Sequence, residues 1–275
     1  MSDDAAVAAT SRFALARRSL LAAITLLTIL PVPPRAQRHI GAREVAGAAP
    51  WFPVVGAVLG LLIGLAGYGA AAQGSPLLGA ALIGILMALV TGALHLDGLA
   101  DSADALGARG GSSERRLEIM RDSSTGAYGT VVIVAWFLLI ASGGATTHPE
   151  TLPLTLAIVM AVARVGAVAH AAALPSARPS GLGAGFTPTG RALLLTIGSF
   201  CLVLVGIYGL ASTDLTVFSH PELGALIAIG AFATLSRGLV DGLAVALLGG
   251  RTGDTIGAVI ALTEATAFAV TALFV

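Results

Sequence analysis

Apolar residues in this chain occur in long blocks that short polar stretches separate. Seven of these blocks are long enough to cross a bilayer, which takes about 20 helical residues. They are residues 51–72, 77–94, 130–146, 152–174, 192–210, 223–248 and 255–275. The pattern predicts an all-α integral membrane protein, a single membrane-embedded domain over 1–275 with about seven transmembrane helices.

An eighth apolar block, residues 20–33, is shorter, with about 14 residues, and ends in prolines. A block of this length is too short to span as a helix, so we expect a short interfacial or re-entrant helix.

Composition supports the membrane assignment. The chain is 56% hydrophobic and 11% charged, with a mean hydropathy of +0.91, and a soluble domain cannot bury so large an apolar fraction. The net charge is zero. We therefore expect the lipid bilayer, and no nucleic acid, as a partner, and the oligomeric state stays open.

The arginines predict the orientation. All 15 basic residues are arginine, and only Arg164 and Arg237 fall inside expected spans. The others precede the first span or lie in the second, fourth and sixth connections, whereas 73–76, 147–151 and 211–222 contain none. By the positive-inside rule the N-terminus and the long connection 95–129 are cytoplasmic, and the C-terminus is external. We expect the protein in the cell (inner) membrane.

Three acids follow the second span in His95-Leu-Asp-Gly-Leu-Ala-Asp-Ser-Ala-Asp104. On a helix Asp97, Asp101 and Asp104 lie within about 40° of one another, so they repel unless a cation neutralises them. Mg²⁺ is the natural partner of such oxygen ligands. The simpler alternative is a solvated helix end. His95 lies on the opposite face and is either a base or an interface residue.

A second polar stretch spans 115–129. Glu118 and Asp122 are four residues apart and could share a cation, which makes Asp122 a further candidate metal ligand. Arg121 is a candidate phosphate-binding group beside it. The turn that follows can cradle phosphate oxygens through backbone N–H groups, and its candidate residues are Ser123, Ser124 and Gly126. An ordinary cytoplasmic loop is the alternative.

Two further loops carry one arginine each. Gly249-Gly-Arg-Thr-Gly-Asp254 opens the last span, where Arg251 and a helix N-terminus attract anions, and Asp254 is a site residue or a helix cap. The glycine-rich loop 175–186 offers Arg178 as a phosphate contact.

Charges also occur within the expected spans. Arg164, Arg237 and Glu264 lie at a similar depth, about 15 Å from the cytoplasmic ends, and Asp241 can pair with Arg237 one turn away. Such charges line a cavity or pair with one another, so substrate contact and a structural ion-pair network are both open.

Together these motifs resemble the cobalamin synthase family, the adenosylcobinamide-GDP ribazoletransferases. The resemblance rests on ordered motifs across nearly the whole chain: 27–33, 51–56, 95–104, 119–129, 177–183 and 249–254. It implies that the chain joins adenosylcobinamide-GDP to α-ribazole or α-ribazole 5′-phosphate and releases GMP, the last stage of cobalamin assembly.

The resemblance also implies roles for these residues. Mg²⁺ held by Asp97, Asp101 and Asp104 would neutralise developing charge, Arg121 and the 123–126 turn would hold the diphosphate, and one acid or His95 would accept the hydroxyl proton. Contacts with other cobamide-assembly enzymes stay open.

Three alternatives remain. A membrane prenyltransferase needs a second Asp-rich repeat, which the chain lacks. A CDP-alcohol phosphotransferase expects Ala-Arg after Asp-Gly, whereas Leu-Ala-Asp101 follows Asp97-Gly98 here. An ion-coupled transporter would place Arg164, Arg237 and Glu264 on the transport path.

Overall fold

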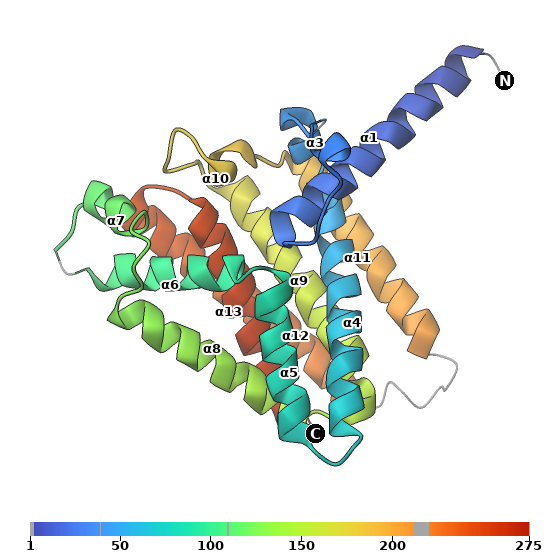
Figure 1. The fold of residues 1–275 in the computed structure, drawn as a ribbon, viewed down its shortest axis with the longest axis vertical. Helices are drawn as coiled ribbons and strands as arrows, with labels where there is room; N and C mark the ends of the chain where they lie inside the picture. The colour runs from blue at the N-terminus through green and yellow to red at the C-terminus, as the bar shows by residue number, and fades with distance from the viewer. Residues whose placement is uncertain (1–2, 39, 109, 212–219, 275) are drawn as a thin grey trace.

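The computed structural model describes residues 3–38, 40–108, 110–211 and 220–274, and these contain helices and no strand. The helices are α1 Asp3–Leu27, α2 Pro34–Gln37, α3 Ala42–Ala46, α4 Phe52–Ala71, α5 Pro76–Val90, α6 Leu94–Gly107, α7 Ser113–Ile119, α8 Ala127–Thr146, α9 Leu152–Ala173, α10 Leu182–Gly185, α11 Gly190–Ala211, α12 His220–Leu248 and α13 Gly253–Thr271. Short 3₁₀ turns, η1 Ala49–Trp51, η2 Pro149–Thr151 and η3 Ala272–Phe274, extend α4, α9 and α13. Figure 1 shows the long helices side by side, with α1 projecting from one end.

The all-α membrane prediction is confirmed. Six helices of the described chain are long and apolar enough to cross a membrane, and α5 followed by α6 adds a seventh if the bent pair counts as one span. The two helices meet at 88°. Gly92 and Ala93 between them have φ of +61° and +57°, a left-handed conformation that ends the α-helix. The predicted span 77–94 therefore ends as a continuous helix at Val90, and the acids lie on α6, a separate helix nearly perpendicular to α5.

The N-terminal helix is longer than the expected 20–33 segment. It begins at Asp3, and the helix ends at Leu27, before Pro31 and Pro33. The prolines cannot continue a helix, which explains its end. Its first half is rich in alanine, which favours helix without raising hydropathy enough to mark an apolar block.

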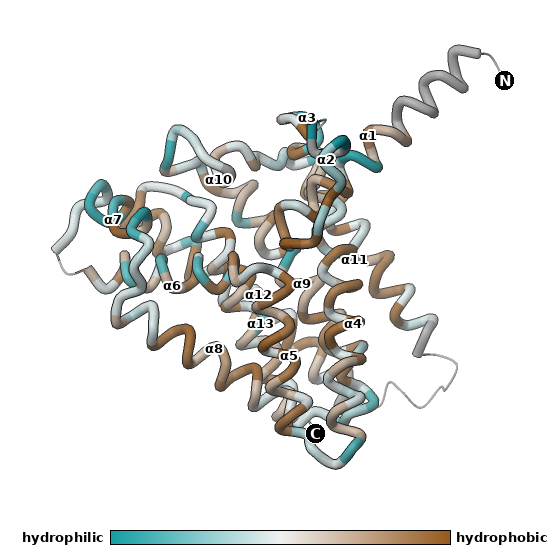
Figure 2. Tube along the Cα trace, viewed as in Figure 1, coloured by the Kyte–Doolittle hydropathy of each residue, from teal (hydrophilic) through white to brown (hydrophobic). Residues whose placement is uncertain are grey.

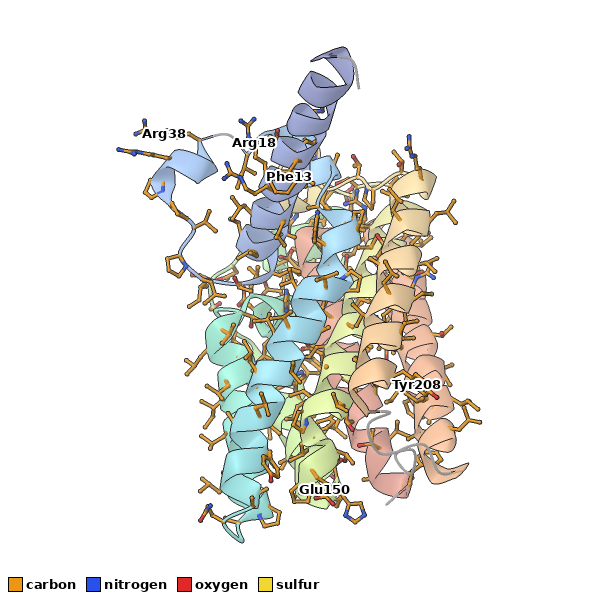
Figure 3. The ribbon with its side chains drawn as sticks, turned by 90° about the vertical axis from the view of Figure 1, so that its right-hand side faces the viewer. Phe13, Arg18, Arg38, Glu150 and Tyr208 are labelled. Carbon is orange, nitrogen blue, oxygen red and sulfur yellow. The ribbon has the colours of Figure 1, made fainter. Side chains whose placement is uncertain are left out.

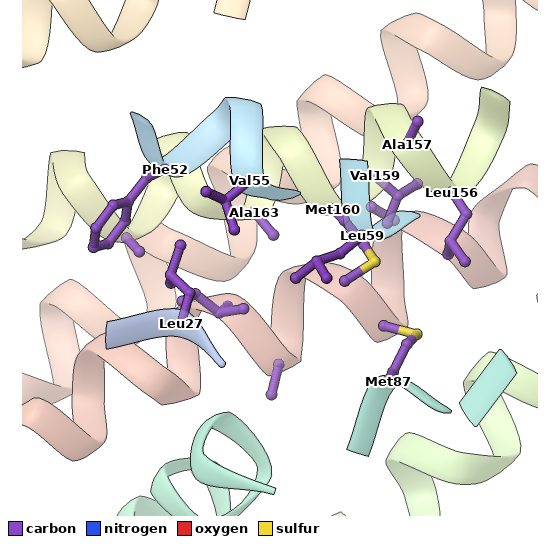
Figure 4. Close-up of a cluster of buried hydrophobic side chains, with 14 of the residues drawn as sticks. Leu27, Phe52, Val55, Leu59, Met87, Leu156, Ala157, Val159, Met160 and Ala163 are labelled. Carbon is purple, nitrogen blue, oxygen red and sulfur yellow. The ribbon is translucent and has the colours of Figure 1, made fainter. Parts of the chain in front are cut away.

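The core lies between α4 and α9. Gly56, Gly60 and Gly64 form a stripe on α4, and a Cβ at Gly56 would lie 2.5 Å from the Met160 carbonyl oxygen of α9. Only glycine permits such a close approach of the two backbones. Figure 4 shows Leu59 beside Met160 in the apolar cluster at this contact.

Polar connections gather at one end of the bundle. Figure 2 shows hydrophilic residues around α3, α7 and α10, and Figure 3 places Arg18 and Arg38 at that end, with Glu150 at the other. These two arginines of the N-terminal segment therefore lie at the same end as the polar connections. Arg109 and the 212–219 part of one connection lie outside the described residues.

Candidate active site

Helix α6 crosses the polar end of the bundle and carries the three acids (Figure 1). Asp97 is exposed, Asp101 and Asp104 are half-buried, and His95 on the opposite side is buried. A Cβ at Gly98 would lie 2.5 Å from the backbone oxygen of Asp254, so this glycine lets α6 pack directly on the start of α13. The predicted stripe is therefore held against a second motif.

The loop before α13 is joined to the loop after α9. The backbone N–H of Ala177 donates to Arg251 O at 2.8 Å, and Arg251 N–H donates to Pro175 O at 2.9 Å. The Arg251 side chain turns inward, is 1% exposed, and donates from Nε to the carbonyls of Ala171 and Leu174 at 2.9 and 3.0 Å. Arg251 therefore positions these loops and does not present its guanidinium to a ligand, contrary to the expected anion contact.

A cavity of about 240 Å³ lies where these segments meet. Its polar lining comes from α6, the loop after α9 and the start of α13, with His95, Asp97, Arg178 and Asp254 among its residues. Leu27 and Phe52 line it from the N-terminal motifs. Residues of five sequence motifs thus meet at one cavity.

Arg178 and Asp254 form an ion pair at this cavity, 3.2 Å apart. Asp254 is not the helix cap, because Thr252 caps α13 by accepting from Thr255 N–H at 3.1 Å. Asp254 stands in the first turn, and its carboxylate is free to pair with Arg178. The N-terminus of α13, with its positive dipole end, faces the cavity together with Arg178, which favours an anionic ligand.

Negative charge accumulates along α6. Burial, assisted by the charges of Asp97 and Asp254, raises the pKa of Asp101 from its usual 3.8 to about 7. At the cavity, burial and then the charge of Arg164 lower the pKa of His95, which keeps its ring neutral near pH 7. The site therefore combines an under-neutralised acid pair with a neutral imidazole.

Asp104 has a different task from the other two acids. Its carboxylate accepts hydrogen bonds from the backbone N–H groups of Gly126 at 2.7 Å and Gly129 at 2.9 Å. It thereby fastens the polar turn to α6, about 10 Å along the helix axis from Asp97. The 123–126 turn belongs to this end of α6 and does not line the cavity.

Within that turn, Asp122 accepts from Ser124 N–H at 3.0 Å and from its hydroxyl at 2.7 Å, and these bonds lower its pKa. Glu118 forms an exposed ion pair with Arg115 at 3.1 Å. Arg121 and Ser123 are exposed. The turn is an exposed polar surface.

No ready-made metal cage is present in the described ranges. Among residues 3–38, 40–108, 110–211 and 220–274, no three acidic, histidine or cysteine side chains are grouped closely enough to hold a metal ion.

The charges within the spans form ion pairs. Arg164 and Glu264 pair with each other and are buried, and neither lines the cavity. Arg237 lies 2.9 Å from Asp241, as its spacing predicts, and Asp241 also contacts His170 Nδ1 at 2.5 Å. Arg164, Arg237 and Glu264 do not line the cavity, although Arg164 lies close enough to His95 for its charge to act on that ring.

Sequence reasoning missed two features of the site. Phe52 and Phe186 stack with ring centroids 4.9 Å apart, and both line the cavity. Arg116 is 8% exposed and donates to Gly111 O at 3.2 Å and Leu106 O at 3.1 Å, which fixes α7 to the end of α6. Neither the aromatic stack nor the Arg116 contacts follow from a periodic pattern in the sequence. The only sequence signal for Arg116 is the adjacent pair of arginines at 115–116.

The chain is similar to known proteins over most of its length. Residues 19–272 match the family model described as cobalamin-5-phosphate synthase. Relatives named adenosylcobinamide-GDP ribazoletransferase include one from Synechococcus sp., 35% identical over 90% of this chain and 92% of its own, and one from Stutzerimonas stutzeri, 36% identical over 89% and 94%. Another, from Trichormus variabilis, is 32% identical over 90% of this chain and 93% of its own. No solved structure gives a significant match.

Proposed function

The chain belongs to the cobalamin-5-phosphate synthase family, and on that premise we propose that it joins adenosylcobinamide-GDP to α-ribazole or α-ribazole 5′-phosphate with release of GMP. The family places it at the final assembly of cobalamin, as a membrane transferase. The observation that carries the proposal is the meeting of His95, Asp97, Arg178 and Asp254, from three separate motifs, at one cavity.

The reaction is a displacement at phosphorus. A ribose hydroxyl oxygen bonds to the corrinoid-side phosphorus of the diphosphate, the bond from that phosphorus to the bridging oxygen breaks, and GMP leaves. The hydroxyl proton passes to a base on the protein. Catalysis of this kind depends on positioning and on neutralising charge at the phosphoryl oxygens.

Anion binding falls to Arg178 and the start of α13. Arg178 is mostly buried and can donate in a fixed direction because Asp254 holds it. The unpaired N–H groups at the helix start add further donors. Arg121 and the 123–126 turn offer a second polar surface farther along α6, so a long substrate can extend over both.

Mg²⁺ fits the acid pair of α6. Asp97 and Asp101 supply hard oxygen donors, and the raised pKa of Asp101 marks uncompensated negative charge there. Mg²⁺ commonly binds one or two carboxylates together with substrate phosphates, so a complete protein cage is not required. Once bound there it would supply charge neutralisation at the phosphoryl oxygens. Asp104 and Asp122 already accept backbone hydrogen bonds and serve the turn.

Two groups are candidates for the base. His95 lines the cavity, and its buried Nδ1 has no hydrogen-bond partner among the described residues, but burial lowers the pKa of the ring and makes it a weak base. Asp101 has a pKa of about 7 without a metal ion, near working pH, so it can serve as the base where Asp97 alone holds Mg²⁺. The variants His95→Gln and Asp101→Asn distinguish the two candidates. Replacement of the residue that acts as the base should abolish one pH-dependent limb of the kcat profile.

We also propose the cell (inner) membrane, with the N-terminus and the site on the cytoplasmic face, because the arginine-bearing connections share one end of the bundle. A cysteine introduced at 144–150 should then react only with reagents outside the cell. Cytoplasmic labelling of it would refute this orientation.

The direct test uses the full chain in detergent with adenosylcobinamide-GDP, α-ribazole 5′-phosphate and Mg²⁺. We expect GMP release that depends on both substrates and on Mg²⁺. Folded protein that releases no GMP would overturn the proposed function, whereas release that is unaffected by chelation would overturn only the role of Mg²⁺.

A further inference from the structure

His170 lies in the last turn of α9, and its ring joins that helix to two others. Nδ1 lies 2.5 Å from a carboxylate oxygen of Asp241 in α12, and Nε2 lies 2.9 Å from the hydroxyl of Thr255 in α13. The residue is completely buried and does not line the cavity. Both ring nitrogens therefore have partners within the protein, and neither is directed to a substrate.

Asp241 sets the orientation of the ring. Its other carboxylate oxygen lies 2.9 Å from the Arg237 guanidinium, so the acid is held from two sides. Because a carboxylate accepts hydrogen bonds, the Nδ1 of His170 carries a proton and donates. A neutral ring then accepts the hydroxyl hydrogen of Thr255 at Nε2, and a protonated ring donates to the hydroxyl oxygen. In either state the ring fixes the Thr255 side chain.

Thr255 is one half of the capping box of α13. Its hydroxyl oxygen accepts from Thr252 N–H at 2.9 Å, and its own N–H donates to the Thr252 hydroxyl at 3.1 Å. These reciprocal bonds close the turn 252–255. Gly253 and Asp254, the two residues between the threonines, line the cavity. His170 therefore binds a side chain of the same turn that lines the cavity.

This turn has little space in which to shift. A Cβ at Gly183 would collide with the backbone nitrogen of Gly253, and a Cβ at Gly98 would lie 2.5 Å from the backbone oxygen of Asp254. The start of α13 thus packs backbone to backbone against α10 and α6. Asp254 also pairs with Arg178 at 3.2 Å, so a displaced turn would move the anion-binding arginine as well.

We propose that His170 is a positioning residue for the anion-binding part of the site. Held by Asp241, it fixes the Thr255 hydroxyl and thereby the N–H groups and the carboxylate at the start of α13. The inference rests on the proposed function and adds to it a residue that touches no substrate. Donors fixed in advance stabilise charge without reorganising, and a displacement of about 1 Å can cost about 100-fold in rate.

The experiment measures the KM of each substrate for GMP release by the full chain in detergent with Mg²⁺. Thr255→Val keeps the shape of the side chain and removes its hydroxyl. We expect the KM for adenosylcobinamide-GDP to rise about 10-fold, and that for α-ribazole, which carries no phosphate, to change less than about 3-fold. Thr255→Ser restores the hydroxyl and should return both KM values to within about 3-fold of wild type.

His170 itself is tested by combining two changes. His170→Phe removes the ring nitrogens and should give the same selective rise in KM. In the Thr255→Val background it should add less than about 3-fold, because both changes break the same bond. The Thr255 pair carries the kinetic test if His170→Phe does not fold.

The matched control is Thr263→Val, in a fully buried threonine of the same helix that does not line the cavity. Its hydroxyl has no hydrogen-bond partner among the described residues, so its kinetic constants should equal those of wild type. A second measurement needs no substrate. Hydrogen exchange at 252–256 should be faster in Thr255→Val and His170→Phe than in wild type, and unchanged in Thr263→Val.

Each outcome gives a decision. A lower kcat with both KM values unchanged means only that fewer molecules are active, which is a purely structural role and overturns the inference. An equal rise in both KM values, additive losses in the double variant, or unchanged exchange at 252–256 also overturns it. Wild-type protein that releases no GMP contradicts the proposed function itself, and the exchange measurement then still decides whether His170 holds the turn.

Discussion

The Arg178 guanidinium lies 3.2 Å from the Asp254 carboxylate, and this pair joins the loop after α9 to the first turn of α13. Their side chains are 19% and 24% exposed, so solvent screens the pair only partly. The carboxylate holds the guanidinium toward the cavity beside the positive end of α13. The pair therefore orients the principal anion-binding group of the site.

Replacing either partner should weaken the transferase. A charge-assisted hydrogen bond is worth about 1.5–3 kcal/mol, so Arg178→Gln and Asp254→Asn should each lower kcat/KM for GMP release by about 10–100-fold. The double variant should lose little more than the worse single variant, because the two side chains act as one unit. Arg115→Gln is the matched control, since that arginine is in an exposed pair away from the cavity. Additive losses in the double variant would mean that the two residues act independently.

Asp104 should matter for the order of the polar turn even without a metal. An asparagine there keeps one acceptor oxygen and leaves either Gly126 or Gly129 N–H without its partner, at a cost of about 1–3 kcal/mol. Asp104→Asn should therefore speed hydrogen exchange at 122–130 in protein stripped of divalent ions. Glu118→Gln, in an exposed ion pair outside this segment, is the control. A change in exchange that occurs only when Mg²⁺ is present would indicate that Asp104 is a metal ligand.

Local patterns predicted the fold better than the site. Hydropathy located most spans because most apolar blocks form one helix each, and the Arg237–Asp241 pair followed from a four-residue spacing. The bend before α6 depends on two left-handed residues, Gly92 and Ala93, and alanine gives no signal of that conformation.

The tasks of the loop arginines could not be separated by sequence. All three loop arginines lie near glycines, yet Arg121 is exposed, Arg178 lines the cavity and Arg251 is buried. The difference arises from tertiary contacts, such as the hydrogen bonds that draw Arg251 toward Ala171. The stacking of Phe52 on Phe186 is equally non-local.

Asp101 should make the protein less stable as the pH rises. Its pKa is raised from 3.8 to about 7 on folding, so the folded state binds the proton more tightly than the unfolded state. This contribution is complete below about pH 4 and is lost as the pH rises to about 7. Three pKa units correspond to about 4 kcal/mol, and solvent screening of this half-buried group reduces that to on the order of 1–2 kcal/mol.

The measurement is thermal unfolding of detergent-solubilised protein without divalent ions. Asp101→Asn should melt higher than wild type at pH 8, and the difference should shrink toward pH 5. Mg²⁺ should stabilise wild type at pH 8 and have little effect on the variant. A variant that melts below wild type at pH 8 would show that the Asp101 charge is already compensated by the protein.

The Arg164–Glu264 pair should prove structural. Both side chains are buried away from the cavity, and a charge left unpaired there costs about 3–5 kcal/mol, so Glu264→Gln should sharply reduce the yield of monodisperse protein. Replacing both partners by apolar residues removes both charges, so Arg164→Met/Glu264→Leu should recover the yield and the GMP release.

Asp101→Ala should give the opposite result, folded protein without activity. An ion-coupled transporter would reverse this ranking, with loss of function following Glu264 and only a mild effect at Asp101. A double variant that folds well but releases no GMP would show that Arg164 and Glu264 contribute to the substrate site.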